Sequence, residues 1–220
     1  MSRTKGTPGG LQERLLQGLA LALFGVVAAS VAWILFTRLH PSRAQALGLN
    51  LALPAPAFTL TDQEGQPFAS TQLAGKVWVA DFIYTRCAAS CPTLSAQLAA
   101  LQKSLHGVPG VAFVSISVDP RHDQPAVLKR YARDFGADLS NWSFLCGDPD
   151  ATATLIRGGF KLPVEMLQAP EPGGKVVDIP HSSSLALVDR HGLIRAYYEG
   201  IEQASWPKLE ESVRALLDER

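Results

Sequence analysis

The amino-acid sequence predicts an α/β domain, a central mixed sheet flanked by helices, preceded by an apolar segment long enough to cross a membrane. Two apolar runs, 77–84 and 111–118, have the length of buried strands, and a segment with helical periodicity follows each of them. Strands that alternate with helices favour a sheet covered on both faces. The composition agrees, since 47% of the 220 residues are hydrophobic and 18% are charged.

The N-terminal segment is a polar head over residues 1–14 and then 23 residues, 15–37, without a charge. At about 1.5 Å per residue the second part makes a helix of roughly 34 Å, longer than the bilayer core of about 30 Å. Three basic residues against one acid predict a cytoplasmic head. We therefore expect a single-pass anchor in the inner membrane, with the domain on the periplasmic side.

A cleaved signal peptide is the alternative, because Ala44-Gln45-Ala46 resembles a cleavage site. The length of the apolar segment and the basic gap before this site favour the uncleaved anchor. Residues 38–53 are expected to be a linker. The sequence Leu53-Pro54-Ala55-Pro56 then breaks any helix and opens a domain over residues 54–220.

The elements of this domain are expected in a β-α-β-α-β-β-α order. They are a short hairpin over 58–68, strand 77–84, helix 92–105, strand 111–118, helix 124–135, strand 142–146, a short helix from 150 to 156, a Gly- and Pro-rich loop over 158–180, a hairpin of strands 184–188 and 193–198, and helix 206–217. This order matches a thioredoxin-like fold. A nucleotide-binding fold is the rival, but no glycine-rich phosphate motif follows the first long strand.

Charge and cysteine content exclude two classes of protein. Lys+Arg and Asp+Glu both number 20, and no basic stripe is present, so we expect no nucleic-acid binding. Three cysteines are too few for a disulfide-stapled mini-protein. Cys146, at the end of a predicted strand, is expected to be a buried core thiol.

The other two cysteines form a Cys87-x-x-x-Cys91-Pro92 motif directly after strand 77–84. Pro92 suits the first turn of a helix, which would place both cysteines at a helix N-terminus. Free N–H groups and the positive dipole end there favour thiolate, the form that binds metal or attacks a disulfide. Four-residue spacing suits one soft metal ion and also permits a disulfide. Two buried structural cysteines are the plainer alternative.

Soft sulfur ligands favour Cu(I), and imidazole is compatible with copper in either oxidation state. The chain has five histidines at which a third ligand could be sought: His40, His106, His122, His181 and His191. His181 lies at the end of the long loop, just before a strand. The residues alone give it only a modest advantage, since a lone loop histidine is usually solvated.

Three ordered motifs make the chain resemble the Sco/SenC family of copper-binding proteins over about residues 54–217. Residues 82–92 are similar to the family's FxFTxCxxxCP segment. Residues 117–125 are similar to its SVDPxxDTP stretch, and residues 178–192 to its DHS segment and the hairpin that follows. A membrane span before the domain also fits this family.

The resemblance implies that Cys87, Cys91 and His181 bind copper, as Cu(I) or Cu(II). It also implies that Asp119, without being a ligand, helps copper loading or the docking of a partner. It implies a metallochaperone, not an enzyme, whose recipient is the copper site of a cytochrome c oxidase subunit during assembly. Two alternatives stay open from other classes. One is a thiol–disulfide oxidoreductase that uses Cys87 and Cys91 to reduce target cysteines before metallation. The other, a peroxiredoxin-like peroxidase, is disfavoured by the paired cysteines.

The sequence departs from the family pattern at two places next to the expected ligands. Ala88-Ala89-Ser90 stands where the family usually has Pro and an acid between the cysteines, and Pro180 stands where an Asp usually precedes the histidine. Both changes remove acidic groups while leaving the ligands intact. We expect them to alter copper affinity, redox potential or the choice of partner.

Overall fold

The computed structural model describes residues 16, 18, 19, 21, 23–33, 44, 47–87, 90–163 and 183–219. The chain divides into two units, Met1–Ala46 and Leu47–Arg220. In the first unit, residues 23–33 are helical, and apolar side chains such as Leu23, Phe24 and Trp33 are exposed. Among the residues described, no helix has the length and apolar content needed to cross a bilayer.

The second unit is built on a six-stranded mixed sheet in the order β1-β8-β7-β4-β5-β6, with β2 and β3 as a separate hairpin. The strands are β1 (Leu53–Pro54), β2 (Thr59–Thr61), β3 (Pro67–Ala69), β4 (Val77–Ile83), β5 (Val111–Ser117), β6 (Trp142–Leu145), β7 (Ser184–Val188) and β8 (Leu193–Glu199). The helices are η1 (Ser70–Leu73), α3 (Ser90–Ser104), α4 (Pro125–Asp134), α5 (Pro149–Thr154), η2 (Leu155–Gly159) and α6 (Ser205–Asp218). The predicted α/β fold with a central mixed sheet is confirmed.

The centre of the sheet is the parallel pair β4 and β5. Their register runs from Val77 opposite Val111 to Ile83 opposite Ser117, and all seven residues of each strand are buried. β6 continues the parallel part, whereas β7 pairs antiparallel with β4. The carboxyl ends of β4 and β5 therefore lie together at one edge of the sheet.

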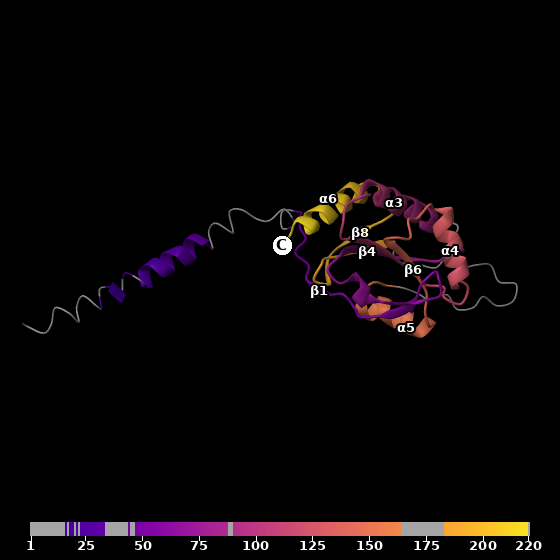
Figure 1. Ribbon diagram of the computed structural model, residues 1–220, viewed down its shortest axis with the longest axis horizontal. Helices are drawn as coiled ribbons and strands as arrows, with labels where there is room; N and C mark the ends of the chain where they lie inside the picture. The colour runs from indigo at the N-terminus through magenta and orange to yellow at the C-terminus, as the bar shows by residue number, and fades with distance from the viewer. Residues whose placement is uncertain are drawn as a thin grey trace, which may run out of the picture. The chain divides into compact units, whose positions relative to one another are not determined.

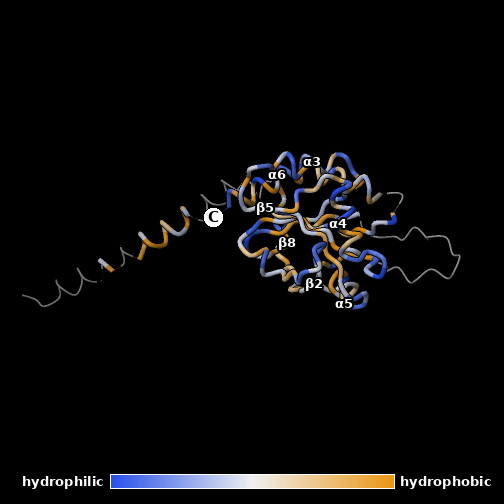
Figure 2. The backbone as a smooth tube through the Cα atoms, turned by 45° about the vertical axis from the view of Figure 1, so that its right-hand side comes forward, coloured by the Kyte–Doolittle hydropathy of each residue, from blue (hydrophilic) through white to orange (hydrophobic). Residues whose placement is uncertain are grey.

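The helices cover both faces of the sheet. Figure 1 shows α3, α4 and α6 on one face and α5 on the other. Figure 2 shows hydrophobic residues gathered along the central strands. On the α5 side, the Phe160 ring packs edge-on against Trp78 and Phe82 of β4. On the other side, Leu94, Leu98 and Leu101 of α3 are buried, as is Leu105 just after the helix, in agreement with their helical spacing.

Two boundaries differ from the predicted ones in ways that affect the cysteines and the sheet edge. α3 begins at Ser90 and not at Pro92, so Cys91 lies within its first turn. A proline three residues into a helix loses no hydrogen bond, because the first N–H groups have no partner within the helix. The segment expected only to open the domain also forms an edge strand, since Leu53 and Pro54 pair with Ile194 and Leu193 of β8.

Replacement of Leu98 by Ala tests how firmly α3 is held against the sheet. Leu98 is fully buried, so loss of its side chain should lower the free energy of unfolding by about 2–5 kcal/mol. Urea unfolding followed by circular dichroism measures this difference. Gln97→Ala, at a half-buried neighbour on the same helix, should change it by only about 0.5 kcal/mol. Equal effects of the two variants would contradict this packing.

Candidate metal centre

Cys87 and Cys91 lie at the carboxyl edge of the sheet, where the chain passes from β4 into α3. Both residues are buried, with exposed fractions of 6% and 1%. The backbone N–H of Cys91 donates a hydrogen bond of 3.4 Å to the Cys87 sulfur, and the N–H of Cys87 donates to the Tyr84 carbonyl at 3.1 Å. The predicted pairing of the two cysteines at a helix N-terminus is thus seen, and a free N–H of the first turn is directed at sulfur.

Burial works against ionisation of the Cys91 thiol. It raises the pKa of Cys91 far above its ordinary value, and the nearby Cys87 and Asp81 raise it further, although a hydrogen bond from the Tyr84 backbone opposes them. The expectation that the helix N-terminus yields a readily formed thiolate is therefore wrong for Cys91. Desolvation of the charged form outweighs the helix dipole here. A positive charge beside the sulfur would reverse the balance.

Arg86 and Asp119 connect the cysteine loop to the segment that follows β5. Asp119 is buried, and its Oδ2 accepts hydrogen bonds from Arg86 Nε at 3.1 Å and Arg86 Nη2 at 2.5 Å. Because Arg86 directly precedes Cys87, this contact links Asp119 to the cysteine loop. The Arg86 guanidinium is the positive group that pairs with the Asp119 carboxylate, and 28% of the Arg86 side chain is exposed.

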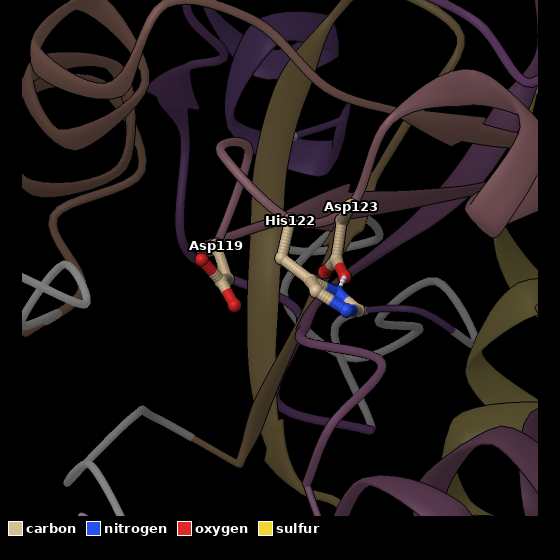
Figure 3. Close-up of side chains that lie close together, drawn as sticks. All are labelled: Asp119, His122 and Asp123. Carbon is tan, nitrogen blue, oxygen red and sulfur yellow. Dashed lines mark hydrogen bonds and ion pairs between the residues drawn. The ribbon is translucent and has the colours of Figure 1, made fainter. Parts of the chain in front are cut away.

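A second cluster of possible metal ligands lies in the same segment. The nearest ligand atoms of Asp119, His122 and Asp123 all lie within 4.8 Å of one another. Figure 3 shows the His122 ring turned toward the Asp123 carboxylate, with Asp119 to one side. His122 Nδ1 is 3.1 Å from Asp123 Oδ1. However, donors of the protein already occupy both carboxylates, so this cluster is better described as a hydrogen-bonded support for the cysteine loop.

Asp81, which the motif analysis did not single out, lies inside β4 in a buried polar network. Its Oδ1 accepts a hydrogen bond of 2.5 Å from Ser115 Oγ, which in turn accepts one of 2.8 Å from Trp142 Nε1. Its Oδ2 has no hydrogen-bond partner among the described residues. Burial raises the pKa of Asp81 to about 7, against the lowering effect of Ser115. An acid within an otherwise apolar strand was the signal available in the sequence.

The remaining predicted site residues differ in how far the structure describes them. His181 lies outside the described residues, so its predicted place in the ligand set stays a prediction. Cys146 is buried, as expected, and is a free thiol. Its backbone exchanges two hydrogen bonds with Thr61, at 2.8 and 2.9 Å, and burial raises its pKa. It belongs to the core beneath the β2–β3 hairpin.

Comparison of the chain with known proteins points to one family. The SCO1/SenC family model covers residues 50–217. The chain is also 30% identical over 191 residues to the SCO1 protein homolog of Bacillus subtilis, covering 86% of this chain and 96% of that protein. The chain belongs to the SCO1/SenC family. The matched range of this SCO1/SenC protein includes the cysteine loop, the 117–123 segment and the β7–β8 hairpin.

Solved structures of the family share the fold of this SCO1/SenC protein. A SCO1/SenC family lipoprotein from Bacillus anthracis is 33% identical, with a TM-score of 0.68, over 76% of this chain and 97% of that one. BsSco, described as a member of the Sco family of cytochrome c oxidase assembly proteins and as having a disulfide switch, is 31% identical, with a TM-score of 0.66, over 78% and 97%. ScoI of Bradyrhizobium japonicum with copper bound, at 24% identity and a TM-score of 0.62 over 75% and 99%, shows the same fold.

The raised pKa of Asp81 predicts a specific pH dependence of stability. The Asp81 carboxyl keeps its proton up to about pH 7 in the folded state, because burial raises its pKa to about 7, whereas in the unfolded chain it loses the proton near its ordinary pKa of 3.8. The folded state binds more protons in this window, so the free energy of unfolding should fall as pH rises from about 4 to about 7, by at most about 4 kcal/mol. Asp81→Asn should flatten this slope.

Urea unfolding at several pH values across the window measures the effect. Asp134→Asn is the matched control, because Asp134 is an acid with 61% of its side chain exposed. The control should keep the wild-type slope. A slope that survives in Asp81→Asn would show that other groups cause the pH dependence.

Proposed function

We propose that this protein is a membrane-anchored copper metallochaperone that binds copper through Cys87, Cys91 and His181. It would deliver the ion to an exported acceptor, the copper site of cytochrome c oxidase during assembly. The observation that carries the proposal is the pair of buried cysteine sulfurs at the N-terminus of α3. Copper here is cargo, so the site must hold the ion and also release it.

The chemistry of the donors fits a soft copper ion. Two cysteine sulfurs four residues apart suit one metal ion, and soft thiolate ligands favour Cu(I). The buried Cys91 resists ionisation on its own, as its raised pKa shows. A bound cation removes that obstacle by displacing the proton from the thiol. Copper binding to Cys91 should therefore release protons to solution.

The third ligand and its support come from the family pattern. His181 stands in the Ile179-Pro180-His181-Ser182 stretch that is similar to the family's histidine segment. Two sulfurs and one imidazole leave a coordination position open, which suits transfer by ligand exchange. Asp119, which accepts hydrogen bonds from Arg86 of the cysteine loop, is proposed to support the ligands without contacting the copper ion.

The relatives support copper as the cargo and the oxidase as the recipient. A protein of Stutzerimonas stutzeri that is 29% identical over 144 residues is named a putative copper-binding protein. BsSco, at 31% identity, is described as belonging to the cytochrome c oxidase assembly proteins. We extend both properties to this chain because its cysteine pair and fold are shared with the family.

The anchor is proposed from the apolar segment 15–37. The described part of that segment, residues 23–33, is helical and exposes its large apolar side chains, as a lipid-facing helix does. The similarity to a family lipoprotein is in keeping with attachment to a membrane. The proposal places the head of residues 1–14 in the cytoplasm and the domain in the periplasm.

A thiol–disulfide oxidoreductase is the second candidate, and one observation favours it. The Cys91 N–H contacts the Cys87 sulfur directly, so the two residues are close enough for exchange chemistry at a helix N-terminus. BsSco, with 31% identity, is described as having a disulfide switch. This function needs both cysteines and no histidine, which separates it from copper delivery.

Removal of single ligands should separate the two functions. Loss of a residue that supports a ligand without contacting the metal typically weakens metal binding by about 10–100-fold. Each of the variants Cys87→Ser, Cys91→Ser and His181→Ala removes a proposed ligand itself, so each should weaken copper binding by more than this. Titration with copper under a competing chelator measures the affinity. His181→Ala should keep its rate of exchange with a disulfide, since both sulfurs remain.

Matched controls are available for both residue types. Cys146→Ser removes the thiol outside the site, and His191→Ala removes an exposed histidine in the β7–β8 turn. Both should bind copper as the wild type does. Unchanged copper affinity in His181→Ala would remove His181 from the ligand set, and loss of exchange in that variant would argue against the separation of the two functions.

A reporter fused to the C-terminus tests the anchor. Alkaline phosphatase, which is active only outside the cytoplasm, should be active on the full chain, and the fusion should stay in membranes washed at high pH. Deletion of residues 15–37 should abolish both properties. A processed, soluble periplasmic product would show that the segment is cleaved, and an inactive reporter would show that the domain is not exported.

A further inference from the structure

Asp123 is a fully buried carboxylate whose two oxygens are both occupied by hydrogen-bond donors. Oδ1 accepts from Thr85 Oγ1 at 2.6 Å, and Oδ2 accepts from the Thr85 backbone N–H at 3.1 Å and from Ser117 Oγ at 2.7 Å. A buried charge is costly unless such donors compensate for lost hydration. We call Asp123, Thr85 and Ser117 the Asp123 clamp.

The Asp123 clamp joins the cysteine loop to the end of β5. Thr85 lies two residues before Cys87, and Ser117 is the last residue of β5. The main-chain pairing of the two strands ends close by, with the Val118 N–H donating to the Ile83 carbonyl at 2.8 Å. The β4–β5 register ends at Ile83 and Ser117, and the clamp continues the connection with a side chain over the described residues that follow.

The Asp123 clamp is itself held in place by short local contacts. The Asp123 N–H donates to the Asp119 carbonyl at 2.9 Å, and the Asp119 N–H donates to Ser117 Oγ at 3.0 Å. The Ser117 hydroxyl thus accepts from one aspartate residue and donates to the other. This closed set of bonds leaves Asp123 a single position relative to β5.

The two cysteines depend on different supports. Cys91 is carried by α3, whose buried leucines fix it against the sheet. Cys87 is carried by the loop between β4 and α3, where its backbone N–H donates to the Tyr84 carbonyl. The separation of the two sulfurs is therefore set by whatever fixes the loop, and binding sites require their groups to be placed within about 0.5 Å.

We propose that Asp123 is a positioning residue that fixes the Cys87 sulfur relative to Cys91. The inference rests on the proposed function for its copper readout, but it applies equally to a disulfide between the same two sulfurs. The carboxylate acts through Thr85 and does not contact the metal. The positioning of Cys87 depends on the shape of the Asp123 side chain and on its hydrogen-bond acceptors, and it does not depend on the negative charge.

Comparison of Asp123→Ala with Asp123→Asn separates shape from charge. The asparagine amide can accept from the Thr85 N–H and Ser117 Oγ with its oxygen and donate to Thr85 Oγ1 with its nitrogen, so the contacts with Thr85 and Ser117 are kept. We expect Asp123→Ala in the full chain to weaken copper binding by about 10–100-fold, and to shift the sulfur-to-copper absorption bands. Asp123→Asn should stay within about threefold of the wild type, with its bands unchanged.

A second readout needs no copper. In a glutathione buffer the Cys87 and Cys91 thiols lose two electrons and two protons to form their disulfide, and one oxidised glutathione is reduced to two thiols. The equilibrium constant for this exchange reports how closely the sulfurs are held. It should fall about tenfold or more in Asp123→Ala and stay near the wild-type value in Asp123→Asn.

Further variants guard against a trivial loss of folding. Ile194→Ala destabilises the core at β8, two strands away from β4 in the sheet, and it should leave the absorption bands and the disulfide equilibrium unchanged. If Asp123→Ala does not fold, Thr85→Val replaces it in the test, because this variant removes only the hydroxyl that donates to Asp123. Thr85→Ser keeps the hydroxyl and should restore the wild-type behaviour. Wild-type bands and a wild-type disulfide equilibrium in Asp123→Ala, or in Thr85→Val, would overturn the inference.

The outcomes also distinguish this inference from the proposed function. If the wild type does not bind copper, the metallochaperone proposal fails, and the disulfide equilibrium still tests the clamp. If the wild type binds copper and Asp123→Asn behaves like Asp123→Ala, the charge and not the shape matters, and the positioning role is wrong.

Discussion

The parallel pairing of β4 with β5 decides where the chemistry of this protein can take place. Seven consecutive residues of each strand lie in register and are buried, so the two strand ends come to the same edge of the sheet. One end continues into the cysteine loop and the other into the segment with Asp119 and Asp123. Arg86 and Asp119, which are 33 positions apart in the chain, are thereby brought into hydrogen-bond contact.

Burial is the second feature that shapes the site. Both cysteines of the pair are buried, and a neutral buried thiol is stable while a buried thiolate without a counter-charge is not. Copper and disulfide formation both remove this conflict, one by supplying positive charge and the other by removing the ionisable group. The same two sulfurs can therefore serve either chemistry, and the choice between the proposed functions depends on the histidine and on the partner.

The loop and the helix supply the two sulfurs with different degrees of support. α3 holds Cys91 through a long buried face, whereas Cys87 relies on side chains from the neighbouring strand end. A chaperone must bind its ion and release it, so rigid placement of one ligand and side-chain control of the other fit such a role. In the Arg86–Asp119 pair the arginine is partly exposed, whereas the aspartate is buried.

Local patterns in the sequence were sufficient for much of this description. The apolar runs, the helical leucines and the turn before β8 predicted the elements in their order, and the Cys87-x-x-x-Cys91-Pro92 motif predicted sulfur chemistry at a helix N-terminus. These features depend on residues close together in the chain, whose periodicity and backbone preferences are local properties.

Only the tertiary structure decided which side chains surround the sulfurs and how that affects them. The burial that raises the pKa of Cys91, the network that buries Asp81, and the bonds of Asp123 to Thr85 and Ser117 all join separate segments. Spacing along the chain cannot give these contacts, because they depend on the strand register and on the packing of α3 over the sheet. Desolvation follows the same rule, since a residue is removed from water by its neighbours in space and not by those in sequence.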